Sequence, residues 1–476
     1  MAGGPRRVAV VGGGIAGLTA AYELTEGAKA AGLDLVCSVI EAETRFGGKI
    51  QTSRVDGLVV EAGPDALLAA KPQALDLCRR LGLSDRVINT RAEDKQTFVW
   101  SRGRLRRLPE GLILGSPARA GALLRSGLLS PRGAARMALD VAVPPRRDGT
   151  EESVASFFTR RLGKEAFERV VEPLLAGIHA GDATRLSLQA TFPRFADMER
   201  QHGGLLRAAL AARRRGDGPI SAGDGRTPFV SLATGLAELP EALTARLRDG
   251  GAELLAGCRT VGLRPATGSG SAGGYEVVLD GRPPMVVDAV VLATPAPVTA
   301  GLVAGLSPPA AGLLQAIRHA STANVSLAYE GGRPPSGYGF VVPRVEKRDL
   351  FAATWSSQKW PGRAPAGRFL VRGYVGGIGR ESVLADDDEG LVRLVRAELA
   401  ALAGIAGRPV HAEVHRYPEG MPQYNLGHGA RVERIRAELA GWPGLAVTGA
   451  AYGGVGIPDC IADAAAAAAG VLAALR

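Results

Sequence analysis

The strongest constraint on the fold is a glycine-rich turn close to the N-terminus. The motif Gly12-Gly13-Gly14-Ile15-Ala16-Gly17 follows a short apolar run, residues 8–11, and precedes a stretch that favours a helix. In such a G-x-G-x-x-G turn, Gly12 permits a tight bend, Gly14 lets backbone N–H groups approach a pyrophosphate, and Gly17 lets the helix pack closely on the strand. A second predicted strand, residues 36–40, ends at Glu41, whose carboxylate suits a ribose diol. This order predicts a dinucleotide-binding α/β unit with a parallel sheet.

The spacing and the next motif refine this prediction. Glu41 lies 24 residues after Gly17, further than in the usual NAD-binding fingerprint. The alternative to dinucleotide binding is a glycine-rich turn in some other α/β protein. The motif Arg45-Phe46-Gly47-Gly48-Lys49 follows shortly afterwards. It resembles the second phosphate-and-ribose contact loop of the flavin amine oxidase and phytoene desaturase superfamily, so we expect FAD rather than NAD.

The length and charge of the chain limit the number of domains and the kinds of binding partner. With 476 residues the chain is long enough for two or three domains. Its formal net charge of +10 favours anionic partners, but the basic residues are interspersed and aromatic residues are only 5% of the chain, which argues against nucleic acid. An anionic membrane surface or a polycarboxylate substrate suits this charge better.

The cysteines and apolar segments indicate the compartment. Cys37, Cys78, Cys258 and Cys460 are far apart and form no C-x-x-C pair, so we expect neither a metal site nor a redox dithiol, and the thiols suit a reducing compartment. The N-terminus lacks a signal-peptide pattern, and arginine, glycine or proline interrupts each apolar stretch before about twenty residues. Residues 112–142 combine leucine and alanine with spaced arginines, as in a solvated helix pair or a membrane-contacting surface. We therefore expect a cytoplasmic protein, either free or peripheral at the inner face of the membrane.

Motifs for nucleophilic or metal-dependent catalysis are absent from the sequence. Neither G-x-S-x-G nor H-E-x-x-H occurs. None of the 6 histidines belongs to a catalytic or metal-binding pattern, so each is interpreted as a structural or surface residue. A flavin enzyme does not need such groups, because the flavin accepts the electrons and the protein supplies position, desolvation and charge.

Longer blocks of the sequence resemble one family. Gly177-Ile178-His179-Ala180-Gly181-Asp182, with Ala-Thr-Phe-Pro at 190–193, is similar to the G-I-Y-A-G-D and T-F-P signature of the porphyrinogen oxidases. Residues 421–428 and 448–461 resemble that family's C-terminal blocks. The segments that look most like the bacterial branch that oxidises coproporphyrinogen III are residues 108–111, 354–361 and 364–367. His179 stands where the family has tyrosine, so no role is carried over to that side chain.

The resemblance implies which residues contact FAD, and we expect a non-covalent complex because no cysteine or histidine lies in a recognisable attachment motif. Val261 matches a place on the adenine side, and Tyr417 one near the flavin. Val455, Gly456 and Ile457 match the segment whose backbone faces the isoalloxazine, before a helix N-terminus that suits negative charge on the reduced ring. The other matching positions are Gly12, Gly13, Gly14, Ile15, Ala16, Gly17, Glu41, Ala42, Lys49, Gly63 and Pro64.

The same resemblance implies substrate contacts. Lys71 matches a position proposed to meet a propionate, Gly177 a backbone contact to a pyrrole N–H, and Trp360 an aromatic that packs on the macrocycle. Arg91 is the first arginine to consider as a further carboxylate partner. The alternative for Lys71 is a solvated helix residue, and the alternative for Trp360 is core packing. No dedicated catalytic residue is expected.

The fold that the resemblance implies is α/β, with an FAD-binding Rossmann-like domain of the amine oxidase superfamily type, a mixed α/β substrate domain and a helical insertion. We expect the FAD-binding domain in three segments, residues 1–90, 216–298 and 431–476. The helical insertion would then occupy residues 91–215, and the substrate-binding domain residues 299–430.

The activity that the resemblance implies is the six-electron oxidation of coproporphyrinogen III to coproporphyrin III in haem biosynthesis. In each of three cycles a meso methylene gives hydride to flavin N5, and molecular oxygen takes the electrons and leaves as hydrogen peroxide. A haem-pathway enzyme that receives the product is a further expected partner. Protoporphyrinogen IX oxidase is the close alternative. An amine or carotenoid oxidoreductase and a non-catalytic flavoprotein or porphyrin carrier are more distant ones.

Overall fold

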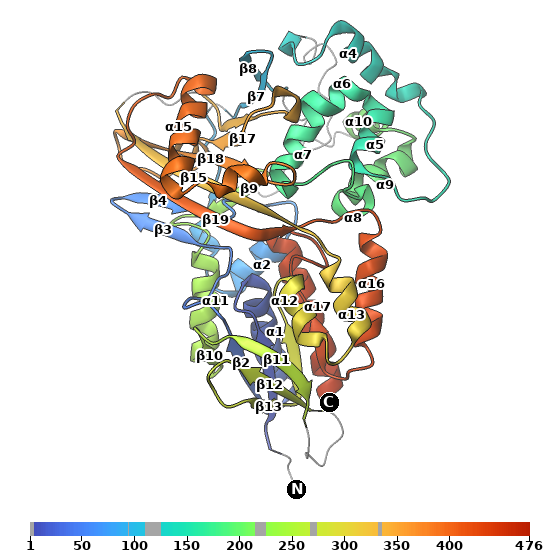
Figure 1. Cartoon of the computed structure of the whole chain (residues 1–476), viewed down its shortest axis with the longest axis vertical. Coiled ribbons are helices and arrows are strands. Elements are labelled where there is room, and N and C mark those ends of the chain that lie inside the picture. The colour runs from blue at the N-terminus through green and yellow to red at the C-terminus, as the bar shows by residue number, and fades with distance from the viewer. Residues whose placement is uncertain (1–3, 94, 110–124, 215–224, 267–273, 332–335) are drawn as a thin grey trace.

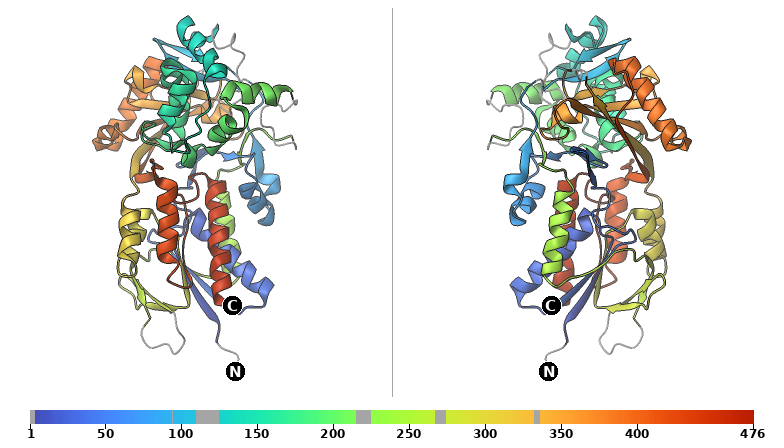
Figure 2. Two further views of the ribbon diagram at one scale, coloured as in Figure 1. Left: turned by 90° about the vertical axis from the view of Figure 1, so that its right-hand side faces the viewer. Right: turned by 90° about the vertical axis from the view of Figure 1, so that its left-hand side faces the viewer.

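The computed structural model describes residues 4–93, 95–109, 125–214, 225–266, 274–331 and 336–476. The chain forms an α/β body that holds both chain ends and a second body in which a large sheet lies beside a group of helices (Figure 1). The two side views in Figure 2 again place both ends at the base of the α/β body. Residues 110–124, part of the predicted helical insertion, lie outside the described residues.

A five-stranded parallel sheet forms the centre of the α/β body, in the order β10-β2-β1-β14-β20. Val8 is paired with Cys37 on one side and with Ala289 on the other. Strand β14 and residues 8–11 of β1 are entirely apolar because helices and a small sheet cover both faces there. The strands are β1 (Arg6–Val11), β2 (Leu35–Ile40), β10 (Glu253–Leu255), β14 (Ala289–Leu292) and β20 (Leu445–Val447).

Each face of this sheet has its own hydrophobic core. On one face lie α1 (Ile15–Ala31), α2 (Gln73–Arg80), α11 (Glu238–Asp249) and α17 (Ile457–Leu475). The other face is covered by α12 (Ala296–Val303), α13 (Pro308–Gln315), α16 (His428–Leu439) and the antiparallel sheet β11 (Thr260–Pro265), β12 (Tyr275–Leu279) and β13 (Met285–Val287).

Helix α17 corrects one expectation from the sequence. The sequence was not expected to contain a stretch long and apolar enough to cross a membrane. By length and composition α17 is such a stretch, because its many alanines make a long segment with few charges. Its residues Ile461, Ala464, Ala468 and Leu472 are nevertheless buried in the core beside α1. A core helix passes the same test of length and composition, so α17 is a weak indication of a membrane span.

The second body contains a seven-stranded sheet in the order β19-β15-β18-β17-β16-β7-β8. Neighbouring strands are antiparallel except β16 and β7, and α15 (Asp388–Ala403) packs on one face. Residues 97–107 form a hairpin that turns at Arg102–Gly103. The strands are β7 (Thr97–Ser101), β8 (Arg104–Arg107), β15 (His319–Glu330), β16 (Gly339–Val341), β17 (Leu350–Thr354), β18 (Arg368–Gly376) and β19 (His411–Pro422).

The helices beside this sheet surround a fully buried ion pair. Arg161 is 0% exposed and lies 2.5 Å from Asp140 and 3.3 Å from Glu199. These helices are α4 (Pro131–Ala138), α5 (Val154–Leu162), α6 (Lys164–Ala166), α7 (Glu172–His179), α8 (Leu188–Thr191), α9 (Pro193–His202) and α10 (Leu205–Arg214), with a π-helical turn at Phe167–Val171 and a 3-10 turn, η3, at Leu139–Ala142.

Short elements connect the two bodies. The hairpin β3 (Thr52–Val55) and β4 (Leu58–Glu61) follows the glycine loop at residues 45–49, and α14 (Ser356–Lys359) precedes β18. A small sheet in the order β5-β9-β6 joins residues 67–68, 229–232 and 87–89. These connections bring the segments at residues 45–71 to the carboxyl edge of the parallel sheet, where β1 and β20 end.

Candidate dinucleotide and substrate site

The glycine turn after β1 has the backbone geometry that its sequence requires. Gly12 has a φ of +106°, and a Cβ there would lie 2.7 Å from the carbonyl oxygen of Ala293. A Cβ at Gly17 would overlap the carbonyl oxygen of Gly12, so only glycine lets α1 pack this closely on the strand. The predicted tasks of Gly12 and Gly17, a tight bend and close packing, are confirmed.

Two long helices present uncapped N-termini at this edge of the sheet. Helix α1 begins after Gly14 and α17 after Gly456, and neither residue provides a side chain that caps the helix. Side chains cap five other helices, at Ser130, Ser153, Ser187, Ser307 and Asp387, whereas α2, α9, α11, α12, α14 and α16 also lack a side-chain cap. What sets α1 and α17 apart is therefore their place beside the glycine turns, not the missing cap alone. Free N–H groups and the helix dipole favour an anion at both uncapped ends. A pyrophosphate therefore fits the α1 end. The α17 end, which Val455, Gly456 and Ile457 form, already has the Asp459 carboxylate in its first turn. Lys71 balances that charge, so a ring that becomes negatively charged still fits there.

The second glycine loop lies directly against the first. The backbone N–H of Gly47 donates a 2.8 Å hydrogen bond to the carbonyl oxygen of Gly13. Within the second loop, the guanidinium of Arg45 donates a 2.8 Å hydrogen bond to the carbonyl oxygen of Gly48. A Cβ at Gly14 would meet only the Cα of Gly48, at 4.0 Å. The backbone of Gly14 thus faces a space that a phosphate group can enter.

Glu41 lies beside the turn, but both of its carboxylate oxygens already accept backbone hydrogen bonds. They come from Gly13 at 2.6 Å and from Glu43 at 2.8 Å. Each oxygen retains acceptor capacity, so a ribose diol would share the carboxylate with the backbone. Ala42 follows it and is half-buried. On the same side, Val261 is 54% exposed, which leaves an apolar surface for an adenine to cover.

A short segment, Ala62-Gly63-Pro64, lies between the second glycine loop and the large sheet of the second body, and we call it the strap. A Cβ at Gly63 would overlap the carbonyl oxygen of Lys49 and would lie 3.5 Å from the hydroxyl of Tyr417. The Lys49 side chain is exposed, but the protein that surrounds it lowers the pKa of its ammonium by desolvation. Burial also raises the pKa of Tyr417. Lys49, Tyr417 and the strap therefore share one partly desolvated space.

Lys71 is engaged in an ion pair across the site. Its Nζ lies 2.5 Å from a carboxylate oxygen of Asp459, in the first turn of α17. Lys71 precedes α2 rather than lying within it, and 45% of its side chain is exposed. An anionic ligand could bind the Lys71 ammonium only together with Asp459, which already contacts it.

Trp360 is fully buried, and its indole N–H donates a 3.2 Å hydrogen bond to Asp65. Lys359 forms an ion pair of 2.9 Å with the same carboxylate. Burial alone would raise the pKa of Asp65, but the charges of Lys359 and Arg372 and the two hydrogen bonds lower it to about 2. This placement favours core packing for Trp360 over contact with a macrocycle. Arg91 is adjacent, because its backbone N–H donates to the carbonyl oxygen of Lys359.

The block at residues 177–182 forms the end of α7 and the turn after it. Gly177 lies in the last turn of α7, and Ile178 is 49% exposed. His179 is buried between Phe192 and Tyr424, and burial lowers its pKa to about 4. The amide of Gln423 donates a 2.9 Å hydrogen bond to the carbonyl oxygen of His179 and so fixes the turn.

Arg372, Asn324 and Asp459 contact the site and were not predicted from the sequence. Arg372 interrupts an otherwise apolar run in β18, which is a recognisable signal for a buried polar role. The other two carry no local pattern that separates them from ordinary polar residues.

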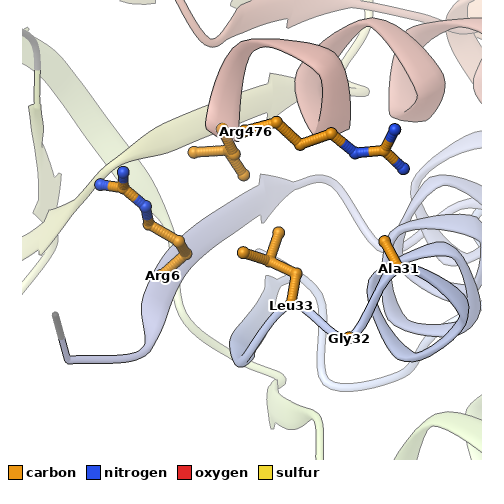
Figure 3. Close-up of a pocket in the computed structure, with 6 residues that line it drawn as sticks. Arg6, Ala31, Gly32, Leu33 and Arg476 are labelled. Atoms are coloured by element: carbon orange, nitrogen blue, oxygen red, sulfur yellow. The ribbon is translucent and has the colours of Figure 1, made fainter. Parts of the chain in front are cut away.

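A surface pocket of about 550 Å³ lies elsewhere in the α/β body (Figure 3). It is lined by Arg6, Ala31, Gly32, Leu33, Leu475 and Arg476. These residues lie at the amino end of β1 and the carboxyl ends of α1 and α17, whereas the glycine turns lie at the opposite edge of the sheet. The pocket is therefore not part of the candidate site.

Comparison with known proteins defines the class. The chain belongs to the flavin containing amine oxidoreductase family, whose model matches residues 15–472. The fold predicted from the sequence is thereby confirmed, as is a flavin enzyme of the oxidase type.

Individual relatives and solved structures show which members of this family the chain resembles. The chain is 36% identical over 465 residues to coproporphyrinogen III oxidase of Bacillus subtilis, covering 97% of both chains. It is 30% identical to protoporphyrinogen oxidase 1, chloroplastic, of Arabidopsis thaliana, covering 96% of this chain and 86% of the relative. A crystal structure of a putative protoporphyrinogen oxidase from Exiguobacterium superposes with a TM-score of 0.86 at 30% identity, covering 98% of each chain. Putrescine oxidase, at 18% identity and a TM-score of 0.69, shares the fold.

Proposed function

We propose that this protein is a cytoplasmic enzyme that oxidises coproporphyrinogen III to coproporphyrin III with non-covalent FAD and molecular oxygen. The observation that carries the proposal is the coverage of the similarity. The relative of 36% identity, named coproporphyrinogen III oxidase, matches along 97% of both chains. One continuous similarity therefore includes the glycine turns, the turn after α7 and the N-terminus of α17.

The choice of FAD rests on two separate anion sites at one edge of the sheet. The uncapped N-terminus of α1, with the open approach at Gly14, suits a pyrophosphate. Non-covalent binding is supported by the cysteines, all four of which are buried. Cys460, in the first turn of α17, is the one closest to the proposed ring site, and burial raises its pKa to about 12. It is therefore a thiol rather than a nucleophilic thiolate at neutral pH.

The overall reaction balances without a further reductant or oxidant. Coproporphyrinogen III loses three hydride equivalents and three protons, six electrons in all, and three O2 become three H2O2. The bound flavin supplies the two-electron acceptor for each hydride. The chain's own contribution is to hold the reactants and to place charge: the α17 N-terminus stabilises negative charge near Val455–Ile457. Gly177 and Ile178 at the end of α7 would face the macrocycle, and Lys71 and Arg91 would meet propionates.

A direct comparison of two substrates tests the proposal. Purified protein loaded with FAD is given coproporphyrinogen III or protoporphyrinogen IX under air, and porphyrin fluorescence is followed. We expect the higher kcat/KM with coproporphyrinogen III. Equal or greater efficiency with protoporphyrinogen IX would favour the second candidate, which the chloroplast relative and the Exiguobacterium structure support by name. Flavin that dithionite reduces but neither porphyrinogen reduces would contradict both.

We also propose peripheral contact between the helical region and an anionic membrane at the inner face, where a downstream haem-pathway enzyme could receive the product. Residues 91–215 carry 23 lysines and arginines against 13 aspartates and glutamates, a net of +10, while the rest of the chain carries 34 of each. The chain's entire net charge thus belongs to this segment. Within the same segment, apolar side chains are exposed: Leu139 at 56% and Val141 at 40% in η3, and Leu210 at 47% in α10.

Vesicle binding tests this contact. We expect the protein to cosediment with phosphatidylglycerol vesicles but not with phosphatidylcholine vesicles, and to be released by salt. The variant Leu139→Ser/Leu210→Ser should bind several-fold more weakly. Val286→Ser is a matched control, because Val286 is equally exposed at 56% but lies on β13 in the α/β body. Equal binding by all three proteins would contradict docking through the helices.

A further inference from the structure

Two buried polar side chains of the large sheet contact the strap from the side of the second body. The amide Nδ2 of Asn324 in β15 donates a 2.5 Å hydrogen bond to the carbonyl oxygen of Ala62. The Nη2 of Arg372 in β18 donates to the same oxygen at 3.0 Å and also to the carbonyl oxygen of Gly63. We call Asn324 and Arg372 the clamp. Each is only 4% exposed, so the clamp is part of the core rather than of the surface.

The clamp retains unused hydrogen-bonding capacity. Asn324 Oδ1 and Arg372 Nε are buried and have no hydrogen-bond partner in the described part of the chain. Such groups are costly in a core unless a ligand or a functional role accounts for them. Both belong to residues that hold the strap, which is one wall of the space shared with Lys49 and Tyr417.

The charge of Arg372 is also only partly compensated. Among the described residues no carboxylate lies within ion-pair distance of its guanidinium, which contacts the carbonyl oxygens of the strap and the ring of Tyr374 at 4.9 Å. The nearby Asp65 carboxylate is already bound by Lys359 and Trp360. A second buried arginine, Arg363, differs in this respect, because Glu61 lies 3.4 Å from its guanidinium. Arg372 is therefore a fixed positive charge beside the strap, whereas Arg363 is neutralised.

We propose that Asn324 and Arg372 are positioning residues that fix the strap against the flavin, and that the charge of Arg372 raises the flavin's reduction potential. This inference rests on the FAD binding proposed above. A buried cation favours a flavin that has gained electrons, because charges interact strongly where water is excluded. The effect requires no contact between Arg372 and the reacting atoms, since the strap lies between them.

The test is the reduction potential of the bound flavin, measured by equilibration with a dye of known potential. Arg372→Gln retains a hydrogen-bond donor and removes the charge. We expect it to shift the two-electron equilibrium at least tenfold toward the oxidised flavin, a fall of about 30 mV. Arg372→Lys keeps the positive charge and should therefore have a reduction potential close to that of the natural protein. Arg363→Gln is the matched control and should shift the potential much less. Burial raises the pKa of its partner Glu61 and the charge of Arg363 opposes this, so Glu61 takes up a proton when the arginine is lost and the local charge stays near zero.

Two further measurements separate the roles. Asn324→Ala should weaken FAD binding several-fold and leave the potential nearly unchanged, because it removes one hydrogen bond to the strap but no charge. If Arg372→Gln does not fold, the same titration of Arg372→Lys against Arg372→His provides the comparison. The inference is overturned by an unchanged potential in FAD-loaded Arg372→Gln, by equal potentials in Arg372→Lys and Arg372→His, or by an equal fall in Arg363→Gln. The titrations use no porphyrinogen, so they stand even if the proposed substrate is wrong.

Discussion

Lys71 and Asp459 are 388 positions apart in the sequence, yet Lys71 Nζ lies 2.5 Å and 2.7 Å from the two carboxylate oxygens of Asp459. Asp459 belongs to the first turn of α17, so the pair fastens the segment before α2 to the helix N-terminus that faces the proposed flavin site. The Asp459 carboxylate also occupies the space beside Gly454 and Gly456. Lys71 thus has a structural partner, and any propionate must compete with it.

We predict that Lys71→Ala raises KM for coproporphyrinogen III about tenfold, corresponding to loss of roughly 1.5 kcal/mol of a charge-assisted contact. The value of kcat should change little, because a propionate is remote from the reacting methylene carbon and its charge is constant during the reaction. The effect should shrink with added salt, since 45% of the Lys71 side chain is exposed. Steady-state kinetics at two ionic strengths provide the measurement.

A double-mutant comparison separates the two partners of Lys71. In an Asp459→Asn background the ion pair is already lost, so Lys71→Ala should still raise KM if Lys71 meets a propionate. An unchanged KM in that background would show that Lys71 serves Asp459 alone, and Arg91 would become the first candidate for the carboxylate.

Gly14 offers a clean test of cofactor binding. A Cβ at Gly14 meets only Gly48 Cα, at 4.0 Å, and the φ of Gly14 is −73°, which any residue adopts. We therefore predict that Gly14→Val folds but is purified without FAD, because its side chain fills the approach to the α1 N-terminus. Absorbance at 450 nm measures the flavin, and circular dichroism measures the fold. Full flavin occupancy in a folded Gly14→Val protein would falsify the assignment.

The parts of the site that are local in sequence could be predicted from sequence alone. The bend at Gly12 and the packing at Gly17 follow from backbone sterics within one strand–turn–helix unit. The uncapped start of α1 follows from the same motif, because glycine has no side chain to cap a helix. These features depend only on residues a few positions away, so the G-x-G-x-x-G motif alone is enough to predict them.

Features that depend on chain topology could not be predicted in this way. Arg372 and Asn324 reach the strap because β15 and β18 are neighbours in the large sheet, and no local pattern reveals that pairing. The partner of Lys71 lies on the last helix of the chain. Trp360 was identified by resemblance as a macrocycle contact, but it is fully buried and its indole N–H is bonded to Asp65, which lies about 300 residues earlier.

Trp360 therefore leads to a prediction about stability rather than binding. Trp360→Phe removes the indole hydrogen bond to the ionised Asp65, and we expect it to lower the free energy of unfolding by about 2 kcal/mol. The KM for the porphyrinogen should change less than twofold, because the side chain has no exposed surface to offer a ligand. Urea unfolding and steady-state kinetics on one preparation measure both. A large rise in KM with little loss of stability would restore the macrocycle contact.

The buried histidines His179 and His428 predict how stability changes with pH. Burial lowers the pKa of each to about 4, and the ring of His428 stacks on Tyr424 at 3.9 Å. The unfolded chain binds these protons near the ordinary value of about 6.5, so between about pH 6.5 and 4 the unfolded state holds more protons than the folded state. Stability therefore falls as the pH drops through this window, by up to about 3 kcal/mol for each histidine.

We expect His179→Phe to flatten this dependence, because phenylalanine fits the ring cluster with Phe192 and Tyr424 and has no proton to bind. Urea unfolding at pH 7.5, 6.0 and 5.0 measures the slope. His202→Phe is the matched control, since His202 lies at the end of α9 and is only half-buried. The variant should gain stability relative to the natural sequence as the pH falls, while the control should follow the natural slope. Parallel curves for all three proteins would mean that His179 is protonated inside the folded core, which would require an acidic partner that its aromatic surroundings do not provide.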